Sequence, residues 1–187
     1  MLKVRASSLG LLMTEAKSID PALLVGDLLA PSRSRPTKEE DTAAKEARLA
    51  PLRDKTLSAG AKTFIEGLAK QFVYRYEPAV TSRPMDKGII VEGQSIELYN
   101  SCFFQSHTKN TERRTVGFLT GEPDIIDLSG RKIIDIKSSW SLDTFPAIKS
   151  AGEDSGYEWQ GRAYMMLWPE EVDSFELAYC MVSTPEE

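Results

Sequence analysis

The sequence of 187 residues contains only two cysteines and a single histidine. Neither Cys102 nor Cys180 belongs to a Cys-x-x-Cys pair. A structural zinc site and an iron–sulfur cluster each need about four Cys or His ligands, so this set builds neither. We expect both cysteines to be free, buried thiols. His107 begins a polar run, which predicts a surface histidine and gives nucleophilic catalysis of the Ser/His or Cys/His kind little support.

Long hydrophobic runs and an excess of basic residues are also missing. No apolar stretch reaches the roughly 18 residues that a membrane helix needs, and the first residues lack the apolar segment of a signal peptide. We therefore expect no membrane association and a cytoplasmic location. The net charge is −5, whereas proteins that wrap nucleic acid by bulk charge are usually basic. Any contact with nucleic acid is expected to depend on local basic patches.

The apolar content is that of a globular chain. Hydrophobic residues make up 41% of the sequence and charged residues 27%, which is enough apolar material for a core. At this length we expect a single domain over residues 1–187. It is expected to comprise a short N-terminal helix (1–14, with its helical pattern over 4–14), a mostly helical insertion (15–85) and a core (86–183).

Within the insertion, two helices are predicted. Residues 37–50 are rich in Ala, Glu, Lys and Arg and read as a solvated helix that is interrupted at Pro51. Residues 58–76 have a stronger helical pattern, with Ser58 as the candidate cap and an aromatic stripe that we expect to be core. The basic residues of this insertion fit a phosphate-tracking surface and a solvated helix face equally well.

The core residues alternate between helix and strand patterns. A helix is expected from about Lys87 to Phe104 and another over residues 156–168. Val116–Thr120 predicts a strand, a hairpin follows, and residues 174–183 alternate as a last strand. The fold class is therefore α/β, with a small mixed central sheet flanked by helices.

The hairpin carries the most informative charges. Residues 128–131 form a plausible turn between two apolar runs. In the second strand, Ile134 and Ile136 share one face, while Asp135 and Lys137 share the other. Packing does not explain an acid and a base two residues apart in an Ile-rich strand. The hairpin also brings Asp124 close to Asp135, and such oxygen ligands suit a hard cation such as Mg²⁺.

Two helices each place one polar residue on an apolar face. Glu92 shares its face with Ile96, Tyr99 and Phe103, and Gln160 shares its face with Tyr157, Tyr164 and Leu167. A carboxylate on such a face must be paired or point into a polar cleft. A plain salt bridge is the alternative explanation for Glu92, and Tyr164 fits a core position equally well.

In order and spacing, these residues resemble the PD-(D/E)XK nuclease superfamily. The matching pieces are Gly88–Glu92, Gly121–Asp124, Asp135–Lys137 and Gln160–Tyr164, the last of which is similar to the QxxxY motif of the RecB-like branch. The likeness is greatest to the YqaJ-like and bacteriophage lambda-type exonucleases and covers residues 85–183. It implies a restriction-endonuclease-like core with an N-terminal helical insertion, although residues 15–85 match the lambda pattern poorly.

The resemblance also implies roles for individual residues. Asp124, Asp135 and the backbone carbonyl of Ile136 would ligate Mg²⁺, for which Mn²⁺ would substitute, and Glu92 would bind through water or a second metal. Lys137 would orient the attacking water and offset charge, and Gln160 would hold that water or the DNA strand. Contacts with DNA or its phosphates are implied for Arg5, Ser7, Ser138 and Tyr164.

The implied activity is that of a metal-dependent deoxyribonuclease. The lambda-type likeness implies a 5′→3′ exonuclease on duplex ends in DNA recombination or repair, in a bacterial or phage-infected cell. It also implies a ring-shaped trimer and a single-strand annealing protein as partner. Two alternatives stay open: a non-catalytic DNA- or protein-binding module on the same fold, and an endonuclease or Holliday-junction resolvase of the same superfamily.

Overall fold

The computed structural model describes residues 2–20, 23, 42–76 and 82–183. The chain divides into two compact units, of which one comprises Met1–Gly10 with Tyr76–Glu187 and the other Leu11–Arg75. In the described parts of the chain, no helix is long and apolar enough to span a bilayer.

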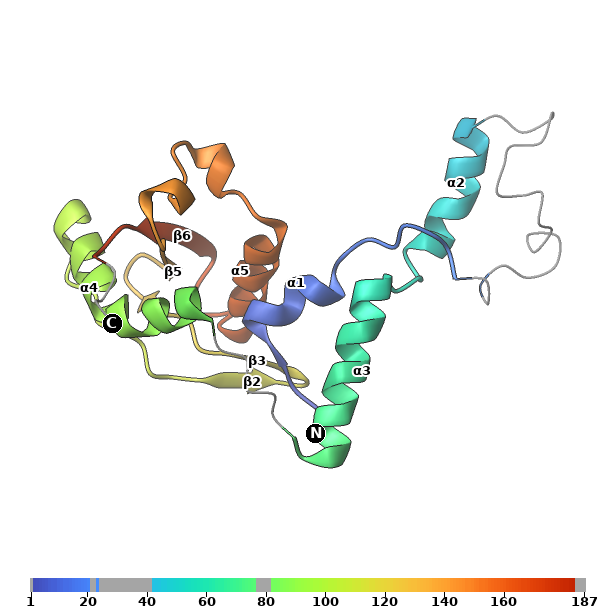
Figure 1. Ribbon diagram of the computed structural model, residues 1–187, viewed down its shortest axis with the longest axis horizontal. Helices are drawn as coiled ribbons and strands as arrows, with labels where there is room; N and C mark the ends of the chain where they lie inside the picture. The colour runs from blue at the N-terminus through green and yellow to red at the C-terminus, as the bar shows by residue number, and fades with distance from the viewer. Residues whose placement is uncertain (1, 21–22, 24–41, 77–81, 184–187) are drawn as a thin grey trace. The chain divides into compact units, whose positions relative to one another are not determined.

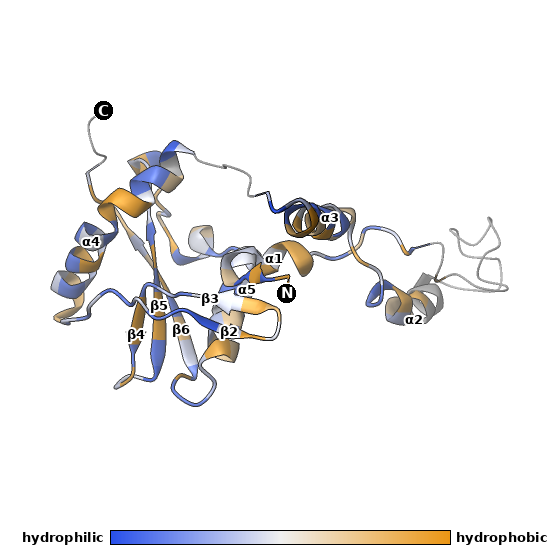
Figure 2. Cartoon of the chain, turned by 90° about the horizontal axis from the view of Figure 1, so that it is seen from below, coloured by the Kyte–Doolittle hydropathy of each residue, from blue (hydrophilic) through white to orange (hydrophobic). Residues whose placement is uncertain are grey.

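The first unit contains the hairpin that the sequence predicts. Strand β4 (Ile125–Asp127) runs antiparallel to β5 (Lys132–Ser138), and β5 runs parallel to β6 (Ser174–Cys180). Asp127 stabilises the turn, because its Oδ1 accepts hydrogen bonds from Ser129 Oγ and Gly130 N. Hydrophobic residues run along β4 and β5, which Figure 2 shows in orange. The predicted hairpin is confirmed, and β5 is the central strand of this sheet.

A second small sheet corrects two of the sequence predictions. Strand β1 (Val4–Arg5) lies parallel to β3 (Leu119–Gly121), which pairs antiparallel with β2 (Arg114–Val116). The helix expected over residues 4–14 is therefore wrong in its first part, because Val4 is buried and donates a backbone hydrogen bond to Phe118 O. It is reduced to η1 (Ala6–Ser8) and α1 (Leu9–Leu12).

The single strand expected over Val116–Thr120 is also wrong. Gly117 has a φ of +58°, a left-handed conformation that glycine adopts without steric cost, and it turns the chain between β2 and β3. Together the two sheets confirm the α/β class and the small mixed sheets flanked by helices. Figure 1 shows β5 and β6 between helices α4 (Arg83–Phe103) and α5 (Ser155–Leu167).

These helices cover opposite faces of the β4–β5–β6 sheet. Helix α4 (Arg83–Phe103) packs Ile96 and Tyr99 against Ile134 and the other buried residues of its face. Helix α5 (Ser155–Leu167) packs Ala163, Tyr164 and Leu167 against the face that contains Ile133. The short helices η5 (Leu142–Thr144) and η6 (Lys149–Gly152) lie between β5 and α5 in sequence.

Helix α5 lies close against the sheet, whereas the last turn of α4 is exposed. A Cβ at Gly161 would overlap the ring of Phe175, so glycine at this position allows α5 to lie close against β6. The last turn of α4 departs from the sequence predictions, because Phe103 is 58% exposed and Cys102 is exposed as well. Only Cys180 of the two cysteines is the buried free thiol that we expected.

The second unit consists largely of helices α2 (Thr42–Arg53) and α3 (Ala59–Tyr74). Ser58 caps α3 as predicted, since its Oγ accepts a hydrogen bond from Ala61 N at 3.0 Å. The interruption expected at Pro51 is wrong, because Pro51 lies inside α2. It is close to the last residue of the helix, Arg53, and it removes one backbone hydrogen bond. The expected helix start at residue 37 lies outside the described residues.

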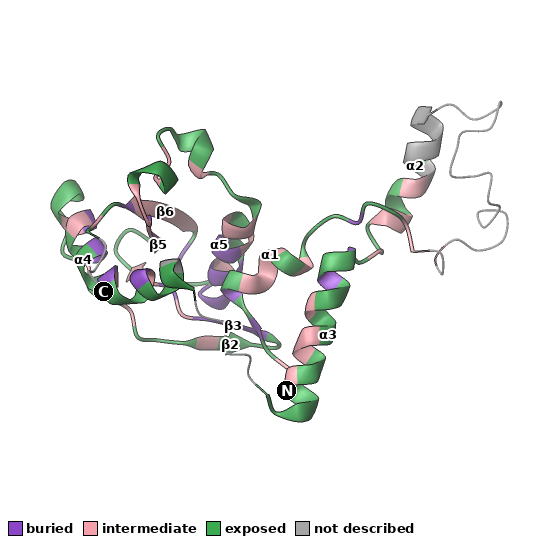
Figure 3. Ribbon diagram, in the orientation of Figure 1, coloured by how far each residue is buried: buried purple, intermediate pink, exposed green. Residues whose placement is uncertain are grey.

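The aromatic stripe of α3 is largely exposed rather than core. Ala61 is buried, but Phe72 and Tyr76, just beyond the helix, are 58% and 61% exposed. Figure 3 shows most of α3 in the colour of exposed residues. The prediction that this stripe forms a core is wrong, because nothing in the described part of the chain covers Phe72 and Tyr76.

Candidate active site

The predicted site residues meet where β5 faces helix α5. Asp135 is 2% exposed, and its Oδ1 accepts a hydrogen bond from Gln160 Nε2 at 3.1 Å. Its Oδ2 forms an ion pair with Lys137 Nζ at 2.5 Å. Alternation along β5 puts the two charged side chains on the same face, as the sequence predicts. The strand and the helix thus hold a carboxylate, an ammonium group and an amide in direct contact.

Gln160 is the centre of this contact network. Its Nε2 also lies 3.0 Å from Tyr164 OH, and its Oε1 lies 3.5 Å from Lys137 Nζ. Tyr164 is buried, and its hydroxyl donates to Glu122 O at 3.4 Å. Burial and the nearby charge of Asp135 raise the pKa of Tyr164, so it remains a neutral hydroxyl. The i, i+4 spacing of Gln160 and Tyr164 brings both to the same side of α5.

Asp124 comes from the other strand of the hairpin. It precedes β4, and its Oδ2 accepts a hydrogen bond from the backbone N–H of Ile136 at 2.6 Å. Burial and the negative charges of Asp135 and Glu92 raise the pKa of Asp124 to about 7, in spite of Ile136 and Lys137. Burial likewise raises the pKa of Asp135 by more than Lys137 lowers it. The site therefore holds more buried negative charge than its own cations balance.

Glu92 approaches the same place from helix α4. Its side chain is 19% exposed, and its Oε2 pairs with Lys109 Nζ at 2.6 Å. Its charge contributes to the raised pKa of both Asp124 and Asp135. The salt bridge that the sequence left as an alternative is present, and it lies at the site rather than away from it.

These side chains line one cleft of about 610 Å³. It contains the five residues predicted as catalytic, together with Ile136, Ser138 and Tyr164. Arg5 and Ser7 are exposed and do not line this cleft; Arg5 ends strand β1. The predictions from sequence missed part of the lining, notably Trp140 and Tyr179. Such residues are commonly core residues and gave no signal of their own.

The donor set suits a hard cation only in part. Among the described residues, no three or more Asp, Glu, His or Cys side chains are grouped as metal ligands. Mg²⁺ usually binds one or two carboxylates and fills its other positions with water and substrate phosphate. Asp124 and Asp135, with their raised pKa values, fit this pattern, while Lys109 engages Glu92.

Two sets of contacts that were not predicted hold the end of β5 and the segment after it. Lys87 of α4 is 2% exposed, and its Nζ donates to Ser139 O at 2.6 Å, Trp140 O at 3.0 Å and Val182 O at 3.1 Å. The hydroxyls of Ser95 and Ser138 lie 2.7 Å apart. A lysine in a helical pattern normally indicates an exposed face, so no sequence signal pointed to this role.

A hairpin that presents two acidic residues and a lysine to a helix glutamate and a helix glutamine is the arrangement of a PD-(D/E)XK nuclease. A scan against models of known protein families finds no match, and a search of curated proteins finds none either. The solved structures do contain similar proteins.

The chain is 30% identical to a phage-related exonuclease from Haemophilus somnus 129PT, with a TM-score of 0.73, and the match covers 98% of this chain and 70% of that one. It is 14% identical to an alkaline exonuclease, LHK-Exo, from Laribacter hongkongensis, with a TM-score of 0.57 over 98% of this chain and 71% of that one. A complex of LHK-Exo with dAMP matches at 16% identity and a TM-score of 0.55, over 89% and 64% of the two chains. The chain belongs to the phage-related exonucleases of the PD-(D/E)XK superfamily, and is a nuclease.

Proposed function

We propose that this nuclease hydrolyses phosphodiester bonds of DNA with the help of Mg²⁺, for which Mn²⁺ can substitute. The observation that carries the proposal is the pair of carboxylates in the cleft, the half-buried Asp124 and the buried Asp135, whose pKa values are both raised. Lys137 already pairs with Asp135, and both pKa values are raised in spite of it, so a further cation would favour the ionised form of both carboxyls. A divalent cation bound there would neutralise the phosphate and lower the pKa of a bound water.

The chain's own residues supply the rest of the reaction. Asp124, Asp135 and the carbonyl of Ile136 would hold the cation, with Glu92 contributing through water or at a second position. Lys137 Nζ, which contacts Asp135 and lies 3.5 Å from Gln160 Oε1, can orient the attacking water and offset negative charge in the transition state. Gln160 fixes Asp135 and can hold that water or the DNA strand. Tyr164 fixes the amide of Gln160 in turn.

The finer features of the activity are part of the same proposal. The likeness to a phage-related exonuclease supports stepwise cleavage from DNA ends, and the dAMP bound to LHK-Exo supports DNA as the substrate class. We assign the chain 5′→3′ polarity on duplex ends and a role in DNA recombination in the cytoplasm of a bacterial or phage-infected cell. A trimeric ring, a single-strand annealing partner, and contacts of Arg5, Ser7 and Ser138 with phosphates complete the proposal.

One assay separates these features. The protein is incubated with Mg²⁺ and linear duplexes labelled at either end, with or without a 5′-phosphate, alongside closed circular DNA. Stepwise loss from 5′-phosphorylated ends is the expected result, with no cleavage in EDTA. Cleavage of the closed circle would show that the protein is an endonuclease or a resolvase and not an exonuclease. DNA binding without cleavage would favour the non-catalytic module.

A further inference from the structure

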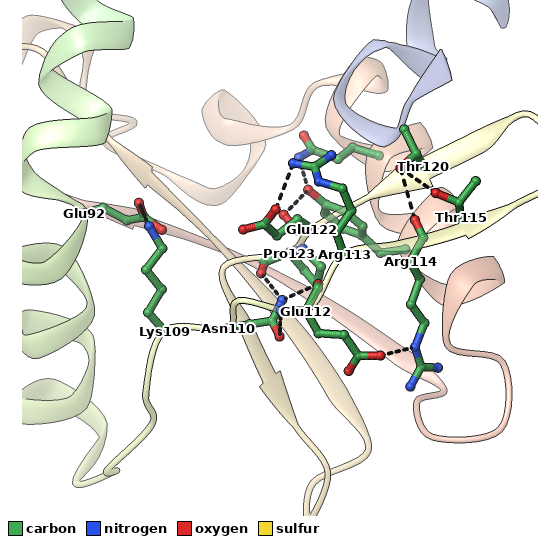
Figure 4. Close-up of polar contacts among 12 residues, drawn as sticks. Glu92, Lys109, Asn110, Glu112, Arg113, Arg114, Thr115, Thr120, Glu122 and Pro123 are labelled. Atoms are coloured by element: carbon green, nitrogen blue, oxygen red, sulfur yellow. Dashed lines mark hydrogen bonds and ion pairs between the residues drawn. The ribbon is translucent and has the colours of Figure 1, made fainter. Parts of the chain in front are cut away.

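The segment of residues 107–114, which we call the strap, leads into β2 and contacts Glu92 and residues 123–124 of the active site. At its start, Asn100 of α4 holds the backbone of His107 with two hydrogen bonds, at 2.9 and 3.0 Å. At its end, Arg114 Nη1 pairs with Glu171 at 2.7 Å. Between them, Lys109 reaches Glu92 of α4, as Figure 4 shows. The strap is thus fixed at several points by polar contacts.

Asn110 lies in the middle of the strap and binds the chain on both sides of it. Its Nδ2 donates to Pro123 O at 2.9 Å, and its backbone N–H donates to Asp124 O at 2.7 Å. The same side chain also closes a local turn, because Nδ2 donates to Glu112 O and Oδ1 accepts from Glu112 N. The contacts of the side chain with Pro123 and Glu112 appear in Figure 4. Asn110 therefore connects the strap directly to the residue pair that contains a candidate catalytic carboxylate.

Asp124 needs such a connection because the sheet does not hold it. The ladder between β4 and β5 begins with the pair Ile125 and Ile134, so Asp124 lies one residue outside it. Its carboxylate has one backbone donor, Ile136 N, at 2.6 Å. The backbone of Asp124 is tied by Asn110 and its side chain by Ile136, and the two contacts together set where the carboxylate points.

We propose that Asn110 is a positioning residue for the nuclease reaction: it fixes Pro123 and Asp124 so that the Asp124 carboxylate meets Ile136 N and faces Asp135. The inference rests on the proposed function only where cleavage is measured, since the position of the carboxylate is a property of the folded protein. Groups that orient a metal-site carboxylate without touching substrate typically contribute about 10- to 100-fold to activity or metal affinity.

Three variants of the full chain test the role. Asn110→Ala removes the three side-chain hydrogen bonds, with Pro123 O, Glu112 O and Glu112 N, and keeps the backbone N–H that donates to Asp124 O. Asn110→Asp keeps the shape and the acceptor of the Glu112 N–H but replaces the donor to Pro123 O with an acceptor. Asn100→Ala is the matched control, because Asn100 also makes two hydrogen bonds to the strap but none to residues 123–124.

The first readout is steady-state cleavage of a linear duplex, with KM and kcat measured separately. We expect kcat to fall about 10- to 100-fold in both Asn110 variants while KM changes less than about 3-fold. Asn100→Ala is expected to keep kcat within about 3-fold of the wild type, even if it lowers the melting temperature. Wild-type kcat in folded Asn110→Ala, or an equal loss in Asn100→Ala, would overturn the proposal.

The second readout does not depend on activity. Amide hydrogen exchange is followed by NMR at Ile136, which donates to Asp124, and at Ile134, which lies in the regular ladder. Exchange at Ile136 is expected to accelerate at least about 10-fold in Asn110→Ala, with Ile134 unchanged. Retained protection of Ile136 would contradict the positioning role. If the wild type cleaves no DNA, the proposed function fails, and the exchange at Ile136 still decides the role of Asn110.

Discussion

The two faces of the β4–β5–β6 sheet carry similar sets of polar residues with opposite electrostatic balance. On the α4 side, Glu176 accepts from Tyr99 OH and from Lys132 Nζ, each at 2.7 Å. On the α5 side, Asp135 pairs with Lys137, and Gln160 donates hydrogen bonds to both Asp135 and Tyr164. Each face therefore has a carboxylate, a lysine and a tyrosine, and residue type alone does not distinguish them.

The pKa values do distinguish them. Burial acts to raise the pKa of Glu176, but hydrogen bonds from Lys132 and Tyr99 outweigh it and leave that pKa below its usual range. Burial raises the pKa of Asp135, and the pKa of Asp124 reaches about 7. The α4 side is a satisfied structural cluster, whereas the α5 side is left with uncompensated negative charge. This difference, rather than the presence of an ion pair, indicates the side with chemistry.

The largest effect is expected on the α5 side. Asp135→Ala or Lys137→Ala removes a metal-holding or charge-offsetting group, and we expect Mg²⁺-dependent cleavage to fall by about 10³-fold or more. Circular dichroism should show a folded protein in both cases. Lys132→Ala, on the same strand and paired with Glu176, is the matched control. Full activity in Asp135→Ala or Lys137→Ala would show that the active-site assignment is wrong.

A large effect of a different kind is expected from the apolar part of the α4 side. Ile134 is fully buried, so Ile134→Ala should leave a cavity and lower the free energy of unfolding by about 2 to 5 kcal/mol. Urea unfolding measures this loss. Well below the melting temperature, kcat should stay within about 3-fold of the wild type, because the side chain of Ile134 does not line the active-site cleft. A large loss of kcat without a loss of stability would show that the two faces are not separate.

Asp124→Asn should lose cleavage activity and gain stability against unfolding. Asp124 has a pKa of about 7 in the folded state and about 4 in an unfolded chain. Between these values the folded state binds more protons, so without metal the free energy of unfolding falls as pH rises from about 4 to about 7. The asparagine removes that penalty, and at pH 8 in EDTA we expect a gain of about 2 kcal/mol together with loss of cleavage. Unfolding curves at pH 5 and pH 8 test this, and a variant less stable than the wild type at pH 8 would contradict it.

The smallest effect is expected from breaking the ion pair between Lys132 and Glu176. Lys132 and Glu176 are each 33% exposed, and such half-exposed pairs contribute less than about 1 kcal/mol. Lys132→Ala should therefore shift the urea midpoint slightly and leave kcat unchanged. A tenfold loss of activity would mean that the α4-side cluster takes part in the reaction.

Much of the core could be predicted from the sequence because its signals are local. The alternation of Ile133 to Lys137 fixes which side chains share a face, and the helical spacing of Gln160 and Tyr164 fixes their common side. The hairpin turn and the Ser58 cap are likewise read from neighbouring residues. For the same reason the sequence pattern alone singles out Asp135, Lys137 and Gln160 as polar residues at positions where packing favours apolar ones.

The errors and omissions depend on contacts between distant residues. Val4 and Arg5 have a helix-compatible sequence, but pairing with β3 makes them a strand. The aromatic residues of α3 follow a core pattern, yet nothing in the described part of their unit covers Phe72. Lys87 and Asn110 act through backbone carbonyl groups of other segments, 52 and 13 residues away in the sequence. Carbonyl groups have no sequence signature, so these roles were not predictable.

The binding of a divalent cation to the metal-free protein tests the central claim most directly. The melting temperature is measured with and without Mg²⁺ or Mn²⁺ for the wild type, Asp124→Asn and Glu176→Gln. If the α5-side carboxylates hold the uncompensated charge, the cation raises the melting temperature of the wild type and of Glu176→Gln, and does so much less in Asp124→Asn. An equal rise in all three proteins, or no rise in the wild type, would contradict the account.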